Sequence, residues 1–247
     1  MDVTATITAN NAAGDSASAE RRQASYRGAA AVAVVVGGLL LALGIPRLVA
    51  AVLALDARPV VWNVYGGATV PGARLTRAAA DLAAAGRWVS DGEQDGDRSL
   101  LLLRAAEAAT TERERSELLS AAEQAVATAL AAASGQPSEW VRLAHLRHRR
   151  GDTAGAVAAL RLSMLSGSFV PALMTSRVEF GLQLLPVLDR EMVELLKRQI
   201  RQTWVIAPQF VSELGTRPEA GALVRDALAG LSEDEMNNYL RLHGIVR

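Results

Sequence analysis

The sequence contains no cysteine, which excludes disulfide bonds and thiolate metal sites. Aromatic residues make up only 4% of the 247 residues while alanine is abundant, and this mixture favours helices over β-structure. The chain also lacks a net charge, because 26 basic residues balance 26 acidic ones. Because there is no overall positive field to attract nucleic acid, we expect no nucleic-acid partner. From the composition we expect an all-α protein.

One long hydrophobic run lies near the N-terminus. Residues 28–45 carry no charge, and a helix of about 18–20 such residues rises the roughly 30 Å that a membrane core requires. Pro46 and Arg47 follow, and then eight more apolar residues up to Leu55. Two placements fit: a span that ends at Pro46, or a longer tilted helix in which Arg47 reaches the headgroups. We predict a single transmembrane helix over residues 28–55.

Two other interpretations of this run have to be weighed. A buried core helix seldom needs so long an uncharged stretch. A cleaved signal peptide would explain the arginines before the run, but the run is long for a signal and no clear A-x-A site follows it. Within the run, Ala29, Ala33 and Gly37 form a stripe of small residues through which two copies could pack. We expect an uncleaved anchor, with self-association through this stripe as a further hypothesis.

The distribution of arginine predicts the orientation of the span. Arg21, Arg22 and Arg27 come immediately before it, whereas Arg58 is the only basic residue soon after its long form. The positive-inside rule then makes residues 1–27 a disordered cytoplasmic tail and places the rest of the chain outside, although arginines at 47, 74 and 77 weaken the asymmetry. In a bacterium this is a single-pass inner-membrane protein with a periplasmic C-terminal domain.

The remainder of the chain reads as a linker followed by helices. Residues 56–71 contain two prolines and two adjacent glycines, and we expect a connector with an extended segment over 60–65. Trp62 and Tyr65 in this connector are typical of a membrane interface. Residues 72–247 show helical periodicity and helix-capping signals. The expected helices cover 75–82, 99–109, 111–133, 138–150, 153–166, 172–184, 189–206, 217–229 and 232–244, with an acidic loop over 91–97.

Residues 138–166 carry a pattern of large and small residues around a Gly-Asp turn. It consists of Trp140, Leu143, Ala144, Gly151, Asp152, Ala156 and Leu160. Thirty-four residues before Ala156 and Leu160 stand Ala122 and Val126, which suit the same positions. This part of the chain resembles the tetratricopeptide repeat, whose repeat length is about 34 residues.

The resemblance departs from the family pattern in three places and covers roughly a quarter of the chain. Arg147 stands where the family has a tyrosine, the repeat-ending proline is missing near Ser168, and the helix over 112–133 is long. The resemblance implies stacked helical hairpins whose concave surface binds a peptide, a helix or another subunit. It also implies a scaffold rather than an enzyme, of the kind that assists envelope assembly or polysaccharide export.

The polar cluster with the most distinctive chemistry is also on residues 138–150. Arg142, His145, His148, Arg149 and Arg150 could contact a protein partner or an anionic group. The structural alternative is that these basic residues complement the C-terminal dipole of their helix. His145 and His148 are spaced to share a metal, but no carboxylate or third histidine accompanies them, so we expect no metal and no cofactor.

The sequence therefore predicts a membrane-anchored, non-enzymatic helical scaffold that binds a protein outside the cytoplasm. Two alternatives stay open. One is a soluble exported binding protein released by signal cleavage. The other is an accessory subunit of an envelope enzyme that binds an anionic group through the Arg142–Arg150 cluster.

Overall fold

The computed structural model describes residues 33–234 together with residues 237 and 241. The chain divides into two compact units, Met1–Val52 and Leu53–Arg247. Every regular element in the described ranges is a helix, which confirms the predicted all-α class. The expected tail over 1–27 and most of the expected helix over 232–244 fall outside the described residues.

The first unit is represented by one apolar helix, Ala33–Leu53, which is long and apolar enough to cross a membrane by length and composition. Its large side chains are exposed, as a lipid-facing helix requires. The helix continues through Pro46, and the Arg47 guanidinium donates to the Leu43 carbonyl oxygen at 3.3 Å. This continuity favours the longer of the two predicted placements. A signal sequence shares these properties. Ala29 of the small-residue stripe lies outside the described residues.

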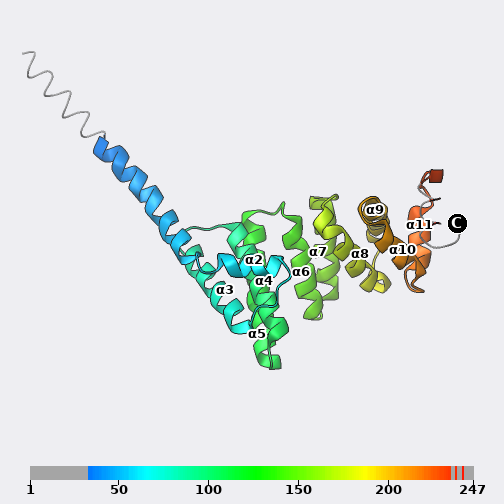
Figure 1. The fold of residues 1–247 in the computed structure, drawn as a ribbon, viewed down its shortest axis with the longest axis horizontal. Helices are drawn as coiled ribbons and strands as arrows, with labels where there is room; N and C mark the ends of the chain where they lie inside the picture. Colours follow the sequence, from blue (N-terminus) through cyan, green and yellow to red (C-terminus); the bar gives the residue numbers. More distant parts are fainter. Residues whose placement is uncertain (1–32, 235–236, 238–240, 242–247) are drawn as a thin grey trace, which may run out of the picture. The chain divides into compact units, whose positions relative to one another are not determined.

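The second unit consists of ten α-helices and one short 3₁₀ turn within the described residues (Figure 1). The helices are α2 (Arg58–Tyr65), α3 (Gly72–Gly86), α4 (Gly92–Ala108), α5 (Glu112–Ala132), α6 (Pro137–Arg149), α7 (Thr153–Ser166), α8 (Pro171–Gln183), α9 (Arg190–Ile206), α10 (Pro208–Thr216) and α11 (Gly221–Leu228), and the 3₁₀ turn η1 (Leu185–Val187) follows α8.

Two kinds of signal start these helices. In α4, α5, α7 and α9 a side chain at the N-cap accepts a hydrogen bond from a backbone N–H of the first turn, as Asp152 does from Gly155 at 2.8 Å. In α6, α8 and α10 a proline occupies the first helical position, where no N–H is needed. The Thr111 cap, accepting from the Glu114 N–H at 3.2 Å, was expected from the sequence.

The local structure differs from the expectations in three places. Residues 58–65 form helix α2 instead of an extended segment, because Val60, Val61 and Val64 bury one helical face. The acidic segment 92–97 is the first turn and a half of α4, since Asp91 caps the helix and the acidic side chains complement its N-terminus. Residues 208–216, which none of the expected helices covers, form helix α10, and Pro208 stands at its first position.

Antiparallel helices pack side by side in the order of the sequence, with α3 on α4, α4 on α5, α5 on α6 and α6 on α7 (Figure 1). Beyond α7 the arrangement changes, because α9 packs against α8, α10 and α11 together. The core between α3 and α7 consists mainly of alanine and leucine, and the small alanine side chains let the helices approach closely. The unit is therefore a stack of helical hairpins that leads into a C-terminal helical cluster.

Candidate interaction site

Helix α6 carries the residues expected to contact a partner or an anion, and the structure separates them by burial. Arg142 is buried and 8% exposed, His145 is half-buried, and His148, Arg149 and Arg150 are exposed. Arg142 is enclosed between α6 and α4, whereas the two later arginines reach the surface at the end of α6. The five residues therefore do not form one surface.

Arg142 is held between α6 and α4 by a buried ion pair. Its guanidinium donates to Glu139 Oε2 at 2.5 Å and to the Gly96 carbonyl oxygen at 2.5 Å. Glu139 is 5% exposed and lies against Gly96, where an added Cβ would come within 2.8 Å of Glu139 Oε1. Glycine at position 96 thus makes room for the carboxylate. Burial raises the pKa of Glu139, and the charge of Arg142 opposes that rise.

A second carboxylate connects this pair to α2. The Tyr65 hydroxyl donates to Asp97 Oδ1 at 2.9 Å. Burial raises the pKa of Asp97, while the hydrogen bond from Tyr65 and the charge of Arg142 lower it. Burial also raises the pKa of Tyr65, so the phenol stays protonated and keeps donating at neutral pH. Helices α2, α4 and α6 are joined through this polar network.

The exposed arginines at the end of α6 pair with carboxylates of earlier helices. Arg149 donates to Glu107 Oε1 of α4 at 3.0 Å, and Arg150 forms an ion pair with Glu123 of α5. Arg147 also approaches Glu123, with Nε 3.6 Å from Oε1. Three of these basic residues, including His148, lie in the last turn of α6 and complement its dipole. The geometry matches the structural alternative stated for this cluster, whereas contact with a partner stays a prediction.

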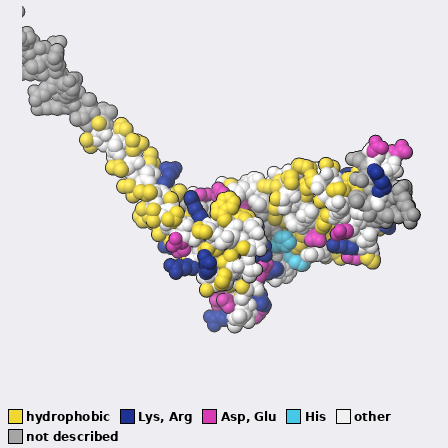
Figure 2. Space-filling model, viewed as in Figure 1, with side chains coloured by type: hydrophobic (Ala, Val, Ile, Leu, Met, Phe, Trp, Pro, Cys, Tyr) yellow, Lys and Arg dark blue, Asp and Glu magenta, His cyan; other side chains and the backbone are white. Residues whose placement is uncertain are grey.

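The two histidines of α6 contact an aromatic ring of α8. The centroid of the His145 ring is 4.0 Å from that of Phe180, and the His148 ring meets the same residue edge-on at 5.4 Å. Burial, followed by the charge of Arg149, lowers the pKa of His145. Figure 2 shows histidine side chains reaching the surface of the second unit. Both histidine rings contact this apolar ring, which a structural role explains.

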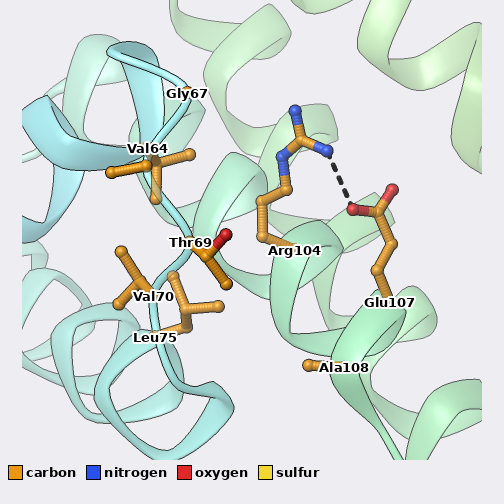
Figure 3. A pocket seen from close by; sticks show the side chains of 9 residues that line it. Val64, Gly67, Thr69, Val70, Leu75, Arg104, Glu107 and Ala108 are labelled. Carbon is orange, nitrogen blue, oxygen red and sulfur yellow. Dashed lines mark hydrogen bonds and ion pairs between the residues drawn. The ribbon is translucent and has the colours of Figure 1, made fainter.

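An open pocket of about 350 Å³ lies beside the ion pair of Arg149 with Glu107 (Figure 3). The sequence did not predict this pocket. The loop after α2 forms one wall with Val70, and α4 forms the other with Ala108. Its polar edge is an ion pair in which Arg104 donates to Glu107 at 2.9 Å, and Glu107 is also the partner of Arg149. The pocket is mainly apolar, and both oxygens of its carboxylate are already paired.

The residues expected to pack the repeat fall largely in the core. Leu143, Ala144, Ala156 and Leu160 are buried, as are Ala122 and Val126 in the preceding hairpin. Gly151 makes the turn between α6 and α7 with φ of +82°, a conformation that favours glycine. Trp140 is only half-buried, and its indole N–H donates to the Ser134 carbonyl oxygen at 2.7 Å. Trp140 therefore fastens the loop before α6 rather than filling the centre of the core.

A buried arginine in α8 was also not predicted from the sequence. Arg177 is 0% exposed, and its guanidinium donates to the Ser163 and Gly167 carbonyl oxygens at 2.6 and 2.8 Å. It also donates to Ser163 Oγ at 3.0 Å and lies 3.4 Å from Gln199 Oε1. Burial lowers its pKa to about 10, so it remains charged at neutral pH. Only its position in the helical register, on the buried side of α8, could have indicated it.

The outward face of α7 is mostly apolar. Its exposed positions are Ser166 at the C-terminal end and four apolar residues at helical spacing, Ala154, Ala158, Leu162 and Leu165, and Phe169 follows the end of the helix. Leu162, Leu165 and Phe169 are 41%, 59% and 53% exposed. We call the five apolar residues of this set the α7 stripe. Figure 2 shows apolar side chains gathered over α7 and α9. Val205 and Ile206 at the end of α9 are also exposed.

No protein-family model matches the chain, and no curated protein matches its sequence. The fold and the sites define the protein by class: an all-α chain that has, within its described residues, one helix that could span a membrane and a domain of packed helical hairpins. Such a fold is consistent with a helical-repeat protein.

Proposed function

We propose that this protein is a membrane-anchored, non-enzymatic helical scaffold whose hairpin domain binds a protein partner in the periplasm. The single observation that carries the proposal is the α7 stripe. An amphipathic helix at the surface of a soluble domain normally turns polar residues to water, whereas the exposed side of α7 is mostly apolar, as is its buried side.

The chemistry of the stripe favours a helix as the occupant. Its residues recur at helical spacing, and a partner helix with a matching apolar face buries them by ridges-into-grooves packing. The rim supplies charges of both signs, since Arg161 pairs with Asp189 and also lies near Glu191. Apolar contact at the centre with charges around it is the usual composition of a protein interface.

The anion-binding alternative is less well supported. Arg142 is buried in an ion pair, and Arg149 and Arg150 are paired with Glu107 and Glu123. An anion would have to displace these carboxylates or tolerate them nearby. The alternative of a cleaved, soluble exported protein shares the α7 stripe with the main proposal and differs only in the fate of residues 28–55.

Site-specific photo-crosslinking in cells tests the partner. A photoreactive residue is placed at Leu165 in the full chain, and the matched control position is Arg113, which lies on α5 with its side chain 89% exposed. We expect a discrete protein adduct from position 165 and none from position 113. Adding Leu162→Asp should abolish the adduct while the amount of protein and its helical content stay unchanged.

Three results would contradict the proposal. Equal crosslinking from positions 113 and 165 would show that contact at the stripe is non-specific. An adduct of twice the chain's own mass would make the occupant a second copy. The absence of any adduct from positions 162, 165 and 169 would leave the stripe without a protein partner.

Sidedness is measured separately. In spheroplasts, protease added outside should digest the domain of a full-length, membrane-bound chain if the domain is periplasmic. A shortened soluble product would establish signal cleavage and support the exported-protein alternative. A protected domain on a membrane-bound chain would place the scaffold in the cytoplasm.

A further inference from the structure

The surface of α2 and α3 combines exposed aromatic residues with arginines that have no acidic partner. Trp62, Tyr65 and Trp88 are 75%, 58% and 52% exposed, and among the described residues only Phe169 is another large aromatic with a comparable exposure. Arg58, Arg74, Arg77 and Arg87 are also exposed, and none forms an ion pair within the described part of the chain. Figure 2 shows basic and apolar side chains interspersed over these helices.

Exposed aromatic residues occur together with unpaired arginines only at the start of the second unit, among the described residues. Between residues 54 and 90 the only acidic residues are Asp56 and Asp81, against four arginines. Farther along the chain, most of the arginines at helix surfaces face carboxylates, as Arg104, Arg149 and Arg150 do. The α2–α3 surface thus has an excess of positive charge that the protein itself does not neutralise.

The helical register places the charges together. Arg74 and Arg77 are one turn apart on α3, on the face opposite the buried Leu75, Ala78 and Leu82. In α2 the buried side is formed by valines, which leaves Trp62 on the solvent side. Indole rings beside arginines suit the boundary between headgroups and acyl chains, where a ring has one apolar and one wet side.

We propose that the α2–α3 surface, defined by Arg58, Trp62, Arg74, Arg77 and Trp88, binds anionic phospholipid headgroups and so lays the domain against the membrane. The proposal rests on the anchor part of the proposed function and adds a lipid-binding site to it. Only residues 54–57 separate the apolar helix from α2, and four residues cannot extend beyond about 18 Å. The covalent connection therefore keeps α2 within reach of the headgroup layer, whichever side of the membrane the domain occupies.

The test uses the absence of cysteine, which allows a single fluorophore to be attached at one introduced position. The full chain is reconstituted in nanodiscs whose lipids carry a headgroup quencher, with and without phosphatidylglycerol. The label is placed through Ala80→Cys on α3 or, as a matched control, through Ala127→Cys on α5; both alanines are exposed. We expect strong quenching at position 80 in the anionic nanodiscs and little at position 127.

Charge-reversal variants then test the arginines. Arg74→Glu with Arg77→Glu should shift the ratio of docked to free domain by roughly fivefold for each arginine removed, and high salt should act in the same direction. Arg190→Glu with Arg198→Glu on α9 is the control, because these arginines are exposed and without a described ion pair but lie outside the α2–α3 surface. This control should leave the quenching unchanged.

The possible failures are distinguishable. If the chain inserts into the nanodiscs but position 80 is quenched no more than position 127, the lipid-binding surface is wrong and the anchor stands. Quenching that survives the Arg74 and Arg77 reversals would also overturn the proposal. If the chain does not insert at all, the anchor fails, and the lipid-binding surface fails with it.

Discussion

Two regions of the hairpin domain bury an arginine, and they neutralise it in different ways. Between α4 and α6, Arg142 faces Glu139 across 2.5 Å. Between α7, α8 and α9, the described contacts of Arg177 are with backbone carbonyls, a serine and a glutamine. The first region holds its arginine with a formal negative charge, and the second with dipoles alone.

Helix ends explain how both solutions work. Glu139 is in the first turn of α6, where the positive end of the dipole favours a carboxylate. Ser163 and Gly167 are at the C-terminal end of α7, where carbonyl groups lack helical partners and carry partial negative charge. Arg177 satisfies those carbonyls from the side of α8. A buried cation therefore does not need a carboxylate when a helix terminus points at it.

The comparison predicts that the Arg142 region is the more sensitive to loss of its arginine. Arg142→Met should lower the free energy of unfolding by about 3–5 kcal/mol, because Glu139 is left as an uncompensated buried charge. Denaturant unfolding followed by circular dichroism measures this loss. The double variant with Glu139→Leu should recover most of the stability, since a buried pair replaced by apolar residues is nearly neutral.

A surface pair provides the control for this experiment. Arg113→Met breaks an exposed pair with Glu117 and should change stability by less than about 0.5 kcal/mol. If the Arg142/Glu139 double variant is as unstable as the single variant, the cost comes from lost packing rather than from charge. That result would remove the distinction between the two regions.

The second prediction concerns Arg177. Arg177→Met should cost about 2–3 kcal/mol, because it leaves the Ser163 and Gly167 carbonyl groups buried without a donor. No carboxylate is stranded, so the added change Gln199→Leu should restore little of the stability. Unfolding curves of the single and double variants measure the coupling. Recovery as large as in the Arg142 region would mean that the two arginines are held by the same kind of interaction.

Much of the fold could be predicted because its signals are local. The Thr111 cap, the proline at the start of α8 and the apolar periodicity of α9 each depend on residues a few positions apart. The errors arose where distant contacts decide the local structure. Residues 58–65 are helical because their valines reach a core formed by later helices, and an isolated segment of eight residues gives no such signal.

The sites were harder to predict for a related reason. The sequence shows that Arg142, Arg149 and Arg150 are close along the chain, but the burial of one and the exposure of the others depend on how α6 packs on α4. Gly96 contributes to this by making room for Glu139 from 43 positions away. The α7 stripe, in contrast, could have been found, since the low polar content of residues 153–166 is visible in the sequence.

The smallest expected effect on stability is at the contact between the two regions, where His145 of α6 stacks on Phe180 of α8. Burial lowers the pKa of His145 below its ordinary value of 6.5, and Arg149 and His148 lower it further, while Glu107 acts in the opposite direction. As the pH falls below 6.5, the unfolded chain binds this proton before the folded chain does. The contribution of His145 to stability is therefore complete above pH 6.5 and decreases as the pH falls toward the lowered pKa.

Melting temperatures of the natural chain and of His145→Gln, measured from pH 8 to pH 5, test this dependence. Carboxylates titrate in both proteins, so the difference between the two curves isolates His145. We expect the natural chain to lose more stability than the variant below pH 6.5 and to match its slope above that value. Parallel curves throughout would show that the stacked ring accepts a proton as easily as a free histidine, and the contact between α6 and α8 would then not resist protonation.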